Sequence, residues 1–102
     1  MGTEEIIRRI QQMEQHLDRA SEAVMQLSAA LENYEEAQTA LKELSDYYGS
    51  DKWKSDFEAD EAGLLPRELR RGVLSEDAIW NVLTDSRDLN VRMLKTVANI
   101  IA

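Results

Sequence analysis

The chain has 102 residues, of which 43% are hydrophobic and 31% are charged, and its formal net charge is −8. These values are typical of one globular domain and exclude a disordered chain. Only 12 Lys and Arg stand against 20 Asp and Glu. We therefore expect neither nucleic acid nor an anionic membrane surface as a partner, because both require a basic face. The sequence contains no cysteine, which excludes disulfides, thiolate metal sites and cysteine nucleophiles.

The start of the chain, MGTEE, has neither a basic region nor an apolar stretch. It therefore predicts no secretory signal. No apolar run approaches the roughly 20 residues that span a bilayer. We expect a soluble, cytoplasmic protein, and the lack of cysteine fits a reducing compartment.

Residues 4–48 carry apolar side chains at alternating spacings of four and three. These are Ile6, Ile10, Met13, Leu17, Ala20, Val24, Leu27, Leu31 and Tyr34. No Gly or Pro interrupts the repeat, so it predicts one long amphipathic helix with a coiled-coil stripe. Up to Ala20 the stripe is about two residues in seven, the width that one facing helix covers. From Ala23 a third apolar position in each heptad widens it, as in a helical bundle.

Residues 51–74 are predicted to form a connector with short helices. Gly49 can take the left-handed conformation that ends the long helix. The polar pair that follows, Ser50 and Asp51, offers two candidates for the start of the next helix.

Five of the six aromatic side chains fall at or around this connector. Trp53 and Phe57 stand four apart, so they share one face of a short helix that Gly63 ends. One further helical turn is expected over residues 67–71, after the Leu-Pro turn. We expect the aromatic and aliphatic side chains to close one end of the bundle.

Four carboxylates of the connector resemble the opening of a calcium-binding EF-hand loop: Asp56, Glu58, Asp60 and Glu61. The match fails because Glu61 stands where that loop needs glycine, and Arg67 stands where it needs a bidentate glutamate. We expect no metal and no cofactor. The carboxylates are better interpreted as an acidic helix face that pairs with nearby arginines, namely Arg67, Arg70 and Arg71.

The last helix is predicted over residues 76–101. Ser75 is its expected N-cap, with Glu76 and Asp77 in the first turn, where carboxylates complement the helix dipole. The polar residues 85–88 mark a place where this helix can kink.

Several of these residues resemble the core pattern of a small bacterial family catalogued as a domain of unknown function. They are Tyr47-Tyr48, Trp53, Asp56, residues 58–63, Leu65-Pro66, Leu69 and Gly72-Val73-Leu74-Ser75-Glu76-Asp77. The similarity covers most of the chain and is densest over residues 47–83. It implies a bacterial source and the same order of long helix, aromatic and acidic connector and last helix. It implies no activity, substrate or cofactor.

The two long helices differ in length, and this difference links the fold to association. Forty-five helical residues extend ~68 Å, whereas twenty-six extend ~39 Å. Folded back antiparallel, the last helix covers the wider stripe and leaves four residues uncovered. These are Ile6, Ile10, Met13 and Leu17, here called the N-terminal seam.

Each large aliphatic side chain left in water forgoes roughly 1.5–3 kcal/mol. We therefore expect a second copy to cover the N-terminal seam in a two-fold symmetric dimer. A break near Ser21 or Ser28 that folds the helix back on itself is the alternative.

The expected fold is an all-α helical bundle in a single domain, residues 1–102, that forms a homodimer. The expected function is that of a non-enzymatic protein that presents a surface to another protein. The candidate partner surface consists of Trp53, Phe57, Asp56, Glu58, Asp60 and Glu61. Two alternatives stay open: an acidic inhibitor that mimics nucleic-acid phosphates, and a metal-dependent hydrolase that uses the connector carboxylates.

Overall fold

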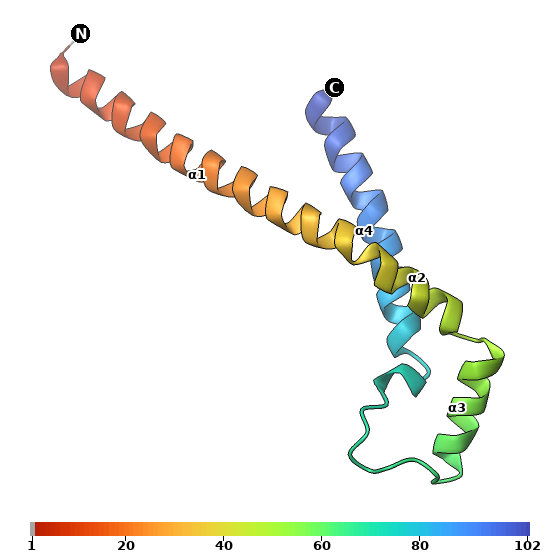
Figure 1. Cartoon of the computed structure of the whole chain (residues 1–102). Coiled ribbons are helices and arrows are strands. Elements are labelled where there is room, and N and C mark those ends of the chain that lie inside the picture. The colour runs from red at the N-terminus through yellow and green to blue at the C-terminus, as the bar shows by residue number, and fades with distance from the viewer. Residues whose placement is uncertain (1) are drawn as a thin grey trace. The chain divides into compact units, whose positions relative to one another are not determined.

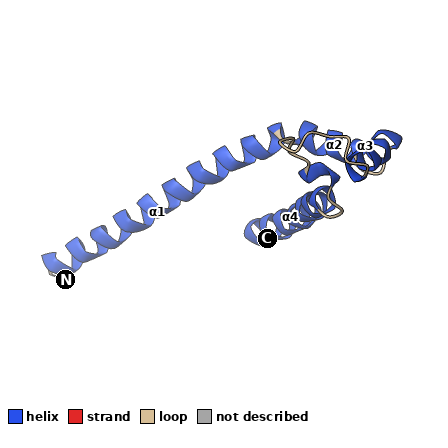
Figure 2. Ribbon diagram, turned by 90° about the horizontal axis from the view of Figure 1, so that it is seen from below, coloured by secondary structure: helices blue, strands red, loops and turns tan. Residues whose placement is uncertain are grey.

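A computed structural model describes residues 2–102. Its elements, in chain order, are α1 (Thr3–Glu36), α2 (Gln38–Tyr47), α3 (Asp51–Glu61), the 3₁₀ helix η1 (Gly72–Leu74) and α4 (Ala78–Ile101) (Figure 1). Figure 2 shows helices joined by loops, with no strand among these residues. The predicted all-α class is confirmed. No helix in the described range is long and apolar enough to cross a bilayer.

The chain divides into two compact units, one that ends at Gln38 and one that comprises Thr39–Ala102. The single domain predicted for residues 1–102 would comprise both units, and it stays a prediction. The first unit is essentially α1, which has Glu4 and Glu5 in its first turn, where carboxylates favour the helix dipole. α1 runs without a break through both serines at which a fold-back was considered, Ser21 and Ser28.

The predicted single helix over residues 4–48 is instead two helices that meet at Ala37. The Ala37 N–H still donates to the Asn33 carbonyl at 3.0 Å. The Tyr34 carbonyl, the usual acceptor for the backbone N–H of Gln38, accepts from the side-chain Nε2–H of Gln38 at 3.0 Å. A side chain inserted into the hydrogen-bond ladder is a known cause of a helix break. The interruption therefore arises from Gln38 and needs no glycine or proline.

The connection between α2 and α3 follows the sequence prediction. Gly49 has φ +77°, the left-handed conformation that glycine adopts without steric cost. Ser50 is the N-cap of α3, and its Oγ accepts from the backbone N–H of Trp53 at 3.2 Å. This resolves the choice between Ser50 and Asp51 in favour of the serine.

α3 ends in a Schellman motif at Gly63, which has φ +71°. The Leu64 N–H donates to the Ala59 carbonyl, and the Gly63 N–H donates to the Asp60 carbonyl, both at 3.0 Å. The prediction that Gly63 ends this helix is confirmed.

The chain then returns to η1 through a loop (Figure 1). The prediction of a helical turn over residues 67–71 is wrong. The segment begins instead with a β-turn, in which the Leu69 N–H donates to the Pro66 carbonyl at 3.3 Å. Pro66 occupies the first position of this turn and supplies the carbonyl that closes it.

α4 begins at Ala78, two residues later than predicted. The Ser75 hydroxyl accepts from the Ala78 N–H at 3.3 Å and donates to the Gly72 carbonyl at 2.7 Å. The serine thus links the end of η1 to the start of α4, but the N-cap of α4 is Asp77, so the prediction of Ser75 as N-cap is wrong. The two acidic residues expected in the first turn lie before the helix instead: Glu76 and Asp77. α4 then continues through residues 85–88 without a break.

Candidate functional site

Trp53 is the centre of the aromatic packing in the second unit. Its ring stacks on Phe57 with centroids 5.4 Å apart and an interplanar angle of 25°. It also meets Tyr48 edge-on, at 5.5 Å and 70°. Both arrangements suit the charge distribution of aromatic rings. The indole Nε1–H donates to the Val73 carbonyl at 2.9 Å, so Trp53 ties α3 to η1.

A small apolar core lies beside this aromatic cluster. Among residues 2–102 the buried hydrophobic side chains are Leu74, which is 7% exposed, and Ile79, which is 1% exposed. They come from η1 and α4, and η1 packs against both α3 and α4. The Tyr48 hydroxyl donates to the Glu76 carbonyl at 3.2 Å. The short η1 segment therefore packs against α3 and α4, and the Tyr48 hydrogen bond ties the residue after α2 to the segment that follows η1.

Tyr47 and Asp56 form a second link between α2 and α3. The Tyr47 hydroxyl donates to Asp56 Oδ2 at 2.6 Å. This hydrogen bond, together with partial burial and the negative charge of Asp56, raises the pKa of Tyr47 to about 12 from its usual 10.0. The phenol therefore stays neutral over a wider pH range than a free tyrosine.

Replacing Tyr47 with Phe is expected to change how stability depends on pH. The folded pKa lies above the unfolded value, so the stabilisation from this pair is fully present below about pH 10 and is lost as the pH rises through about 12. Urea denaturation at a series of pH values should show a steeper loss between pH ~10 and ~12 for the intact chain than for Tyr47→Phe. Parallel pH profiles for the two proteins would contradict this assignment.

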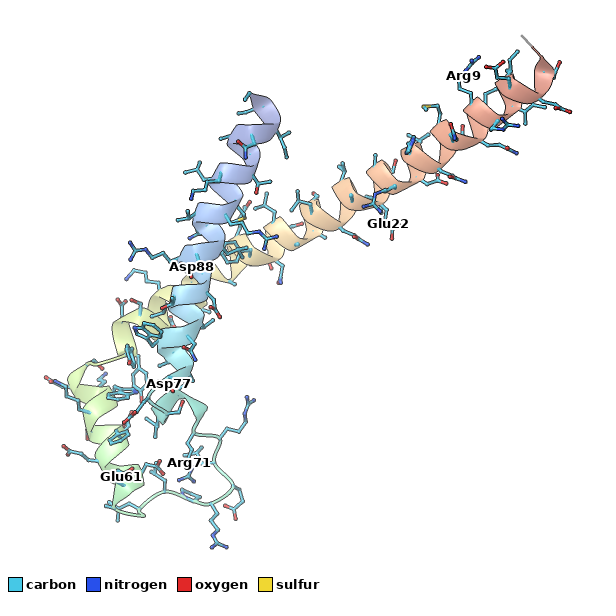
Figure 3. All side chains as sticks on the ribbon, turned by 180° about the vertical axis from the view of Figure 1, so that it is seen from behind. Arg9, Glu22, Glu61, Arg71, Asp77 and Asp88 are labelled. Carbon is cyan, nitrogen blue, oxygen red and sulfur yellow. The ribbon has the colours of Figure 1, made fainter. Side chains whose placement is uncertain are left out.

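Arg71 holds the loop between α3 and η1. Its guanidinium pairs with the Asp60 carboxylate and donates to the Pro66 carbonyl, and its Nε–H donates to the Leu69 carbonyl at 3.3 Å. The side chain lies between the loop and α3 (Figure 3). The predicted pairing of the acidic helix face with an arginine is thus realised by Arg71.

The six residues of the candidate partner surface fall into two groups. Trp53 and Phe57 are half-buried, and Asp56 and Asp60 bond to side chains of the same unit. Asp56, Glu58 and Glu61 are exposed, whereas Asp60 is half-buried. Within the described residues no three His, Asp or Glu side chains come close enough together to hold a metal ion. The members that bond within the unit have a structural role there, and the partner surface stays a prediction.

The N-terminal seam lies along α1, as the spacing predicts. Its four side chains are all exposed: Ile6 39%, Ile10 54%, Met13 55% and Leu17 58%. The stripe continues toward the end of α1 with further exposed residues, including Val24, Leu27 and Leu31. A lone helix cannot cover its own apolar stripe, so within the first unit this surface is left exposed.

A family model described as "Domain of unknown function (DUF4298)" matches residues 10–96. The chain belongs to this family. The DUF4298 match contains every element that carried the resemblance, from Tyr47-Tyr48 to Asp77, so the resemblance is confirmed. No curated protein and no solved structure matches the chain.

The DUF4298 match covers parts of both units. Three members of the N-terminal seam lie within it, and Ile6 lies just before it. The contacts that sequence reasoning missed also lie within it, notably the bonds of Trp53 to Val73 and of Tyr48 to Glu76. Their partners are 20 and 28 residues away, and no local signal marks them.

Proposed function

We propose that the chain is a non-enzymatic helical protein that acts as a homodimer through the N-terminal seam. The observation that carries this proposal is the exposure of all four seam side chains, between 39% and 58%, on one continuous helix. At roughly 1.5–3 kcal/mol for each side chain fully covered, even partial burial of the seam contributes several kcal/mol per copy. That gain favours association strongly over an exposed seam.

The width of the stripe supports two copies. Two apolar residues in seven present a surface that one facing helix covers, whereas larger bundles need a third apolar position. Polar and charged residues flank the seam, including Arg9, Glu14 and Asp18. They keep the sides of the pair in water.

The contacts of the second unit support a non-enzymatic function. Trp53 and Arg71, together with the carboxylates Asp56 and Asp60, bond to groups of their own unit. Groups engaged in this way stabilise the fold. Within this proposal the protein is bacterial and cytoplasmic, and it presents its remaining acidic surface to another protein.

Light scattering behind size exclusion tests the proposal on the intact chain. Over a hundredfold range of concentration we expect a molar mass twice the 11.7 kDa of the chain. The measurement is repeated at high salt, because apolar association should persist when charges are screened. A mass of 11.7 kDa at every concentration would overturn the proposal.

Calorimetry distinguishes the hydrolase alternative. Titration with millimolar Mg²⁺, Mn²⁺ or Ca²⁺ should give no binding heat if the connector carboxylates serve the fold. A saturable heat that Glu58→Gln and Glu61→Gln abolish would favour the metal-dependent function instead. The acidic-inhibitor alternative requires binding to a basic partner that weakens steeply as salt rises.

A further inference from the structure

The spacing of the N-terminal seam assigns a heptad position to each residue of α1. Ile10 and Leu17 occupy a positions, and Ile6 and Met13 occupy d positions. The residues that flank the seam at g and e decide how two such helices recognise each other. Here they include an oppositely charged and exposed pair, Arg9 at g and Glu14 at e.

A parallel pair of helices in register sets each g residue beside the e residue five positions later on the other helix. Arg9 of one copy then lies beside Glu14 of the second copy. Two-fold symmetry makes this contact twice. Within one helix, residues five apart do not face each other, so a charge attraction between Arg9 and Glu14 requires two chains.

An antiparallel pair loses this attraction. If Ile6 packs against Leu17 of the second copy, each e position faces an e position and each g position faces a g position. Glu14 then lies beside Ile7, and Arg9 lies beside His16. The first contact sets a carboxylate against an aliphatic side chain, and the second sets a cation against an imidazole.

We propose that the N-terminal seam binds a second copy of this chain in a parallel, in-register coiled coil, with reciprocal Arg9–Glu14 pairs across the interface. This inference rests on the proposed homodimer. It adds the direction of the two helices, their register and the residues that set both.

The absence of cysteine makes a direct test of direction possible. Thr3 occupies an a position and Ala20 occupies a d position, so neither Thr3→Cys nor Ala20→Cys removes a large seam side chain. A parallel pair places each new thiol beside its own copy. An antiparallel pair that covers the seam places position 3 beside position 20, and leaves identical positions about 26 Å apart, far beyond disulfide reach.

The two cysteine variants are mixed, equilibrated under reducing conditions and then oxidised gently. Mass spectrometry distinguishes the three disulfide products. The expected products are disulfides between two copies of position 3 and between two copies of position 20, with little of the mixed 3–20 disulfide. The same mixture in urea should give all three disulfides. A predominant 3–20 product would overturn the parallel arrangement and leave the homodimer intact. A dimer that yields none of the three would also overturn it.

A charge exchange tests the pair itself. Arg9→Glu and Glu14→Arg should each weaken dimerisation by about fivefold to tenfold, as expected for two exposed ion pairs turned repulsive. The double exchange should restore the dissociation constant to within about twofold of the starting value. Arg8→Glu, on the outer face, makes the same charge change and should leave it unchanged. Additive losses in the double variant would contradict the pairing.

Light scattering of all variants under reducing conditions tests the homodimer separately from the direction of its two helices. If every variant and the intact chain are monomers, the proposed homodimer fails and the direction fails with it. If they are dimers, the disulfide and charge-exchange results decide the direction alone.

Discussion

Leu17→Glu is expected to convert the proposed dimer into a monomer. Leu17 occupies an a position of the N-terminal seam, so the substitution removes an apolar contact from each copy and sets two carboxylates against each other. The lost burial alone amounts to about 1.5–3 kcal/mol per copy. At 1.4 kcal/mol for each factor of ten, the dissociation constant should rise by at least about a hundredfold. Light scattering over a concentration series measures this change directly.

Gln15→Glu is the matched control for this prediction. Position 15 lies two residues away on the outer face of the same helix and is exposed. The substitution adds the same negative charge and has a similar helix propensity. It should leave the molar mass unchanged. Equal masses for the two variants would mean that the seam does not mediate association.

Trp53→Ala is expected to destabilise the second unit by about 3 kcal/mol, the lower end of the range for a buried tryptophan, because the side chain is half-buried. The substitution removes the stack on Phe57, the edge contact with Tyr48 and the hydrogen bond to the Val73 carbonyl. A unit with so few fully buried side chains has little stability to lose. Urea denaturation followed by circular dichroism should show a much lower midpoint.

The chain provides its own control in its other tryptophan. Trp80 is 55% exposed, so Trp80→Ala should change stability by less than about 0.5 kcal/mol. Trp53→Phe keeps a ring but removes the indole N–H, and should cost about 1 kcal/mol from the lost hydrogen bond. The expected order of midpoints is Trp80→Ala, Trp53→Phe, Trp53→Ala, from highest to lowest. Similar midpoints for the two alanine variants would contradict the central position of Trp53.

The ends of α3 could be predicted from sequence because their causes are local. Ser50 acts on an N–H three residues later, and Gly63 closes a motif within six residues. The N-terminal seam could be predicted for a related reason, since a heptad repeat states which side chains share a face whatever that face contacts. Local geometry is sufficient for all of these features.

The features that the sequence did not predict have causes that spacing does not express. The break at Ala37 depends on one side-chain rotamer, because the amide of Gln38 takes the Tyr34 carbonyl. The later start of α4 follows from Ser75, which bonds forward and backward at once and leaves residues 76 and 77 outside the helix. Periodicity and propensity alone favour an uninterrupted helix in both places.

The hydrogen bond of Asp56 and the ion pair of Asp60 depend on partners in other segments of the chain. Alternating carboxylates predict an acidic surface, but Asp56 lies against a tyrosine and Asp60 against an arginine from other segments. Only the folded chain brings these groups together. A carboxylate pattern therefore does not show which of its members bond within the fold.

The loop after α3 owes its shape to one guanidinium. Arg71 binds a carboxylate on α3 and two carbonyls of the loop through separate N–H groups, a task for which its planar, forked head group is suited. Lysine carries the same charge but presents a single point of attachment, so it cannot reproduce this three-way connection. At position 71, side-chain shape therefore constrains which basic residue the loop tolerates, and an exchange that preserves charge would still release the segment.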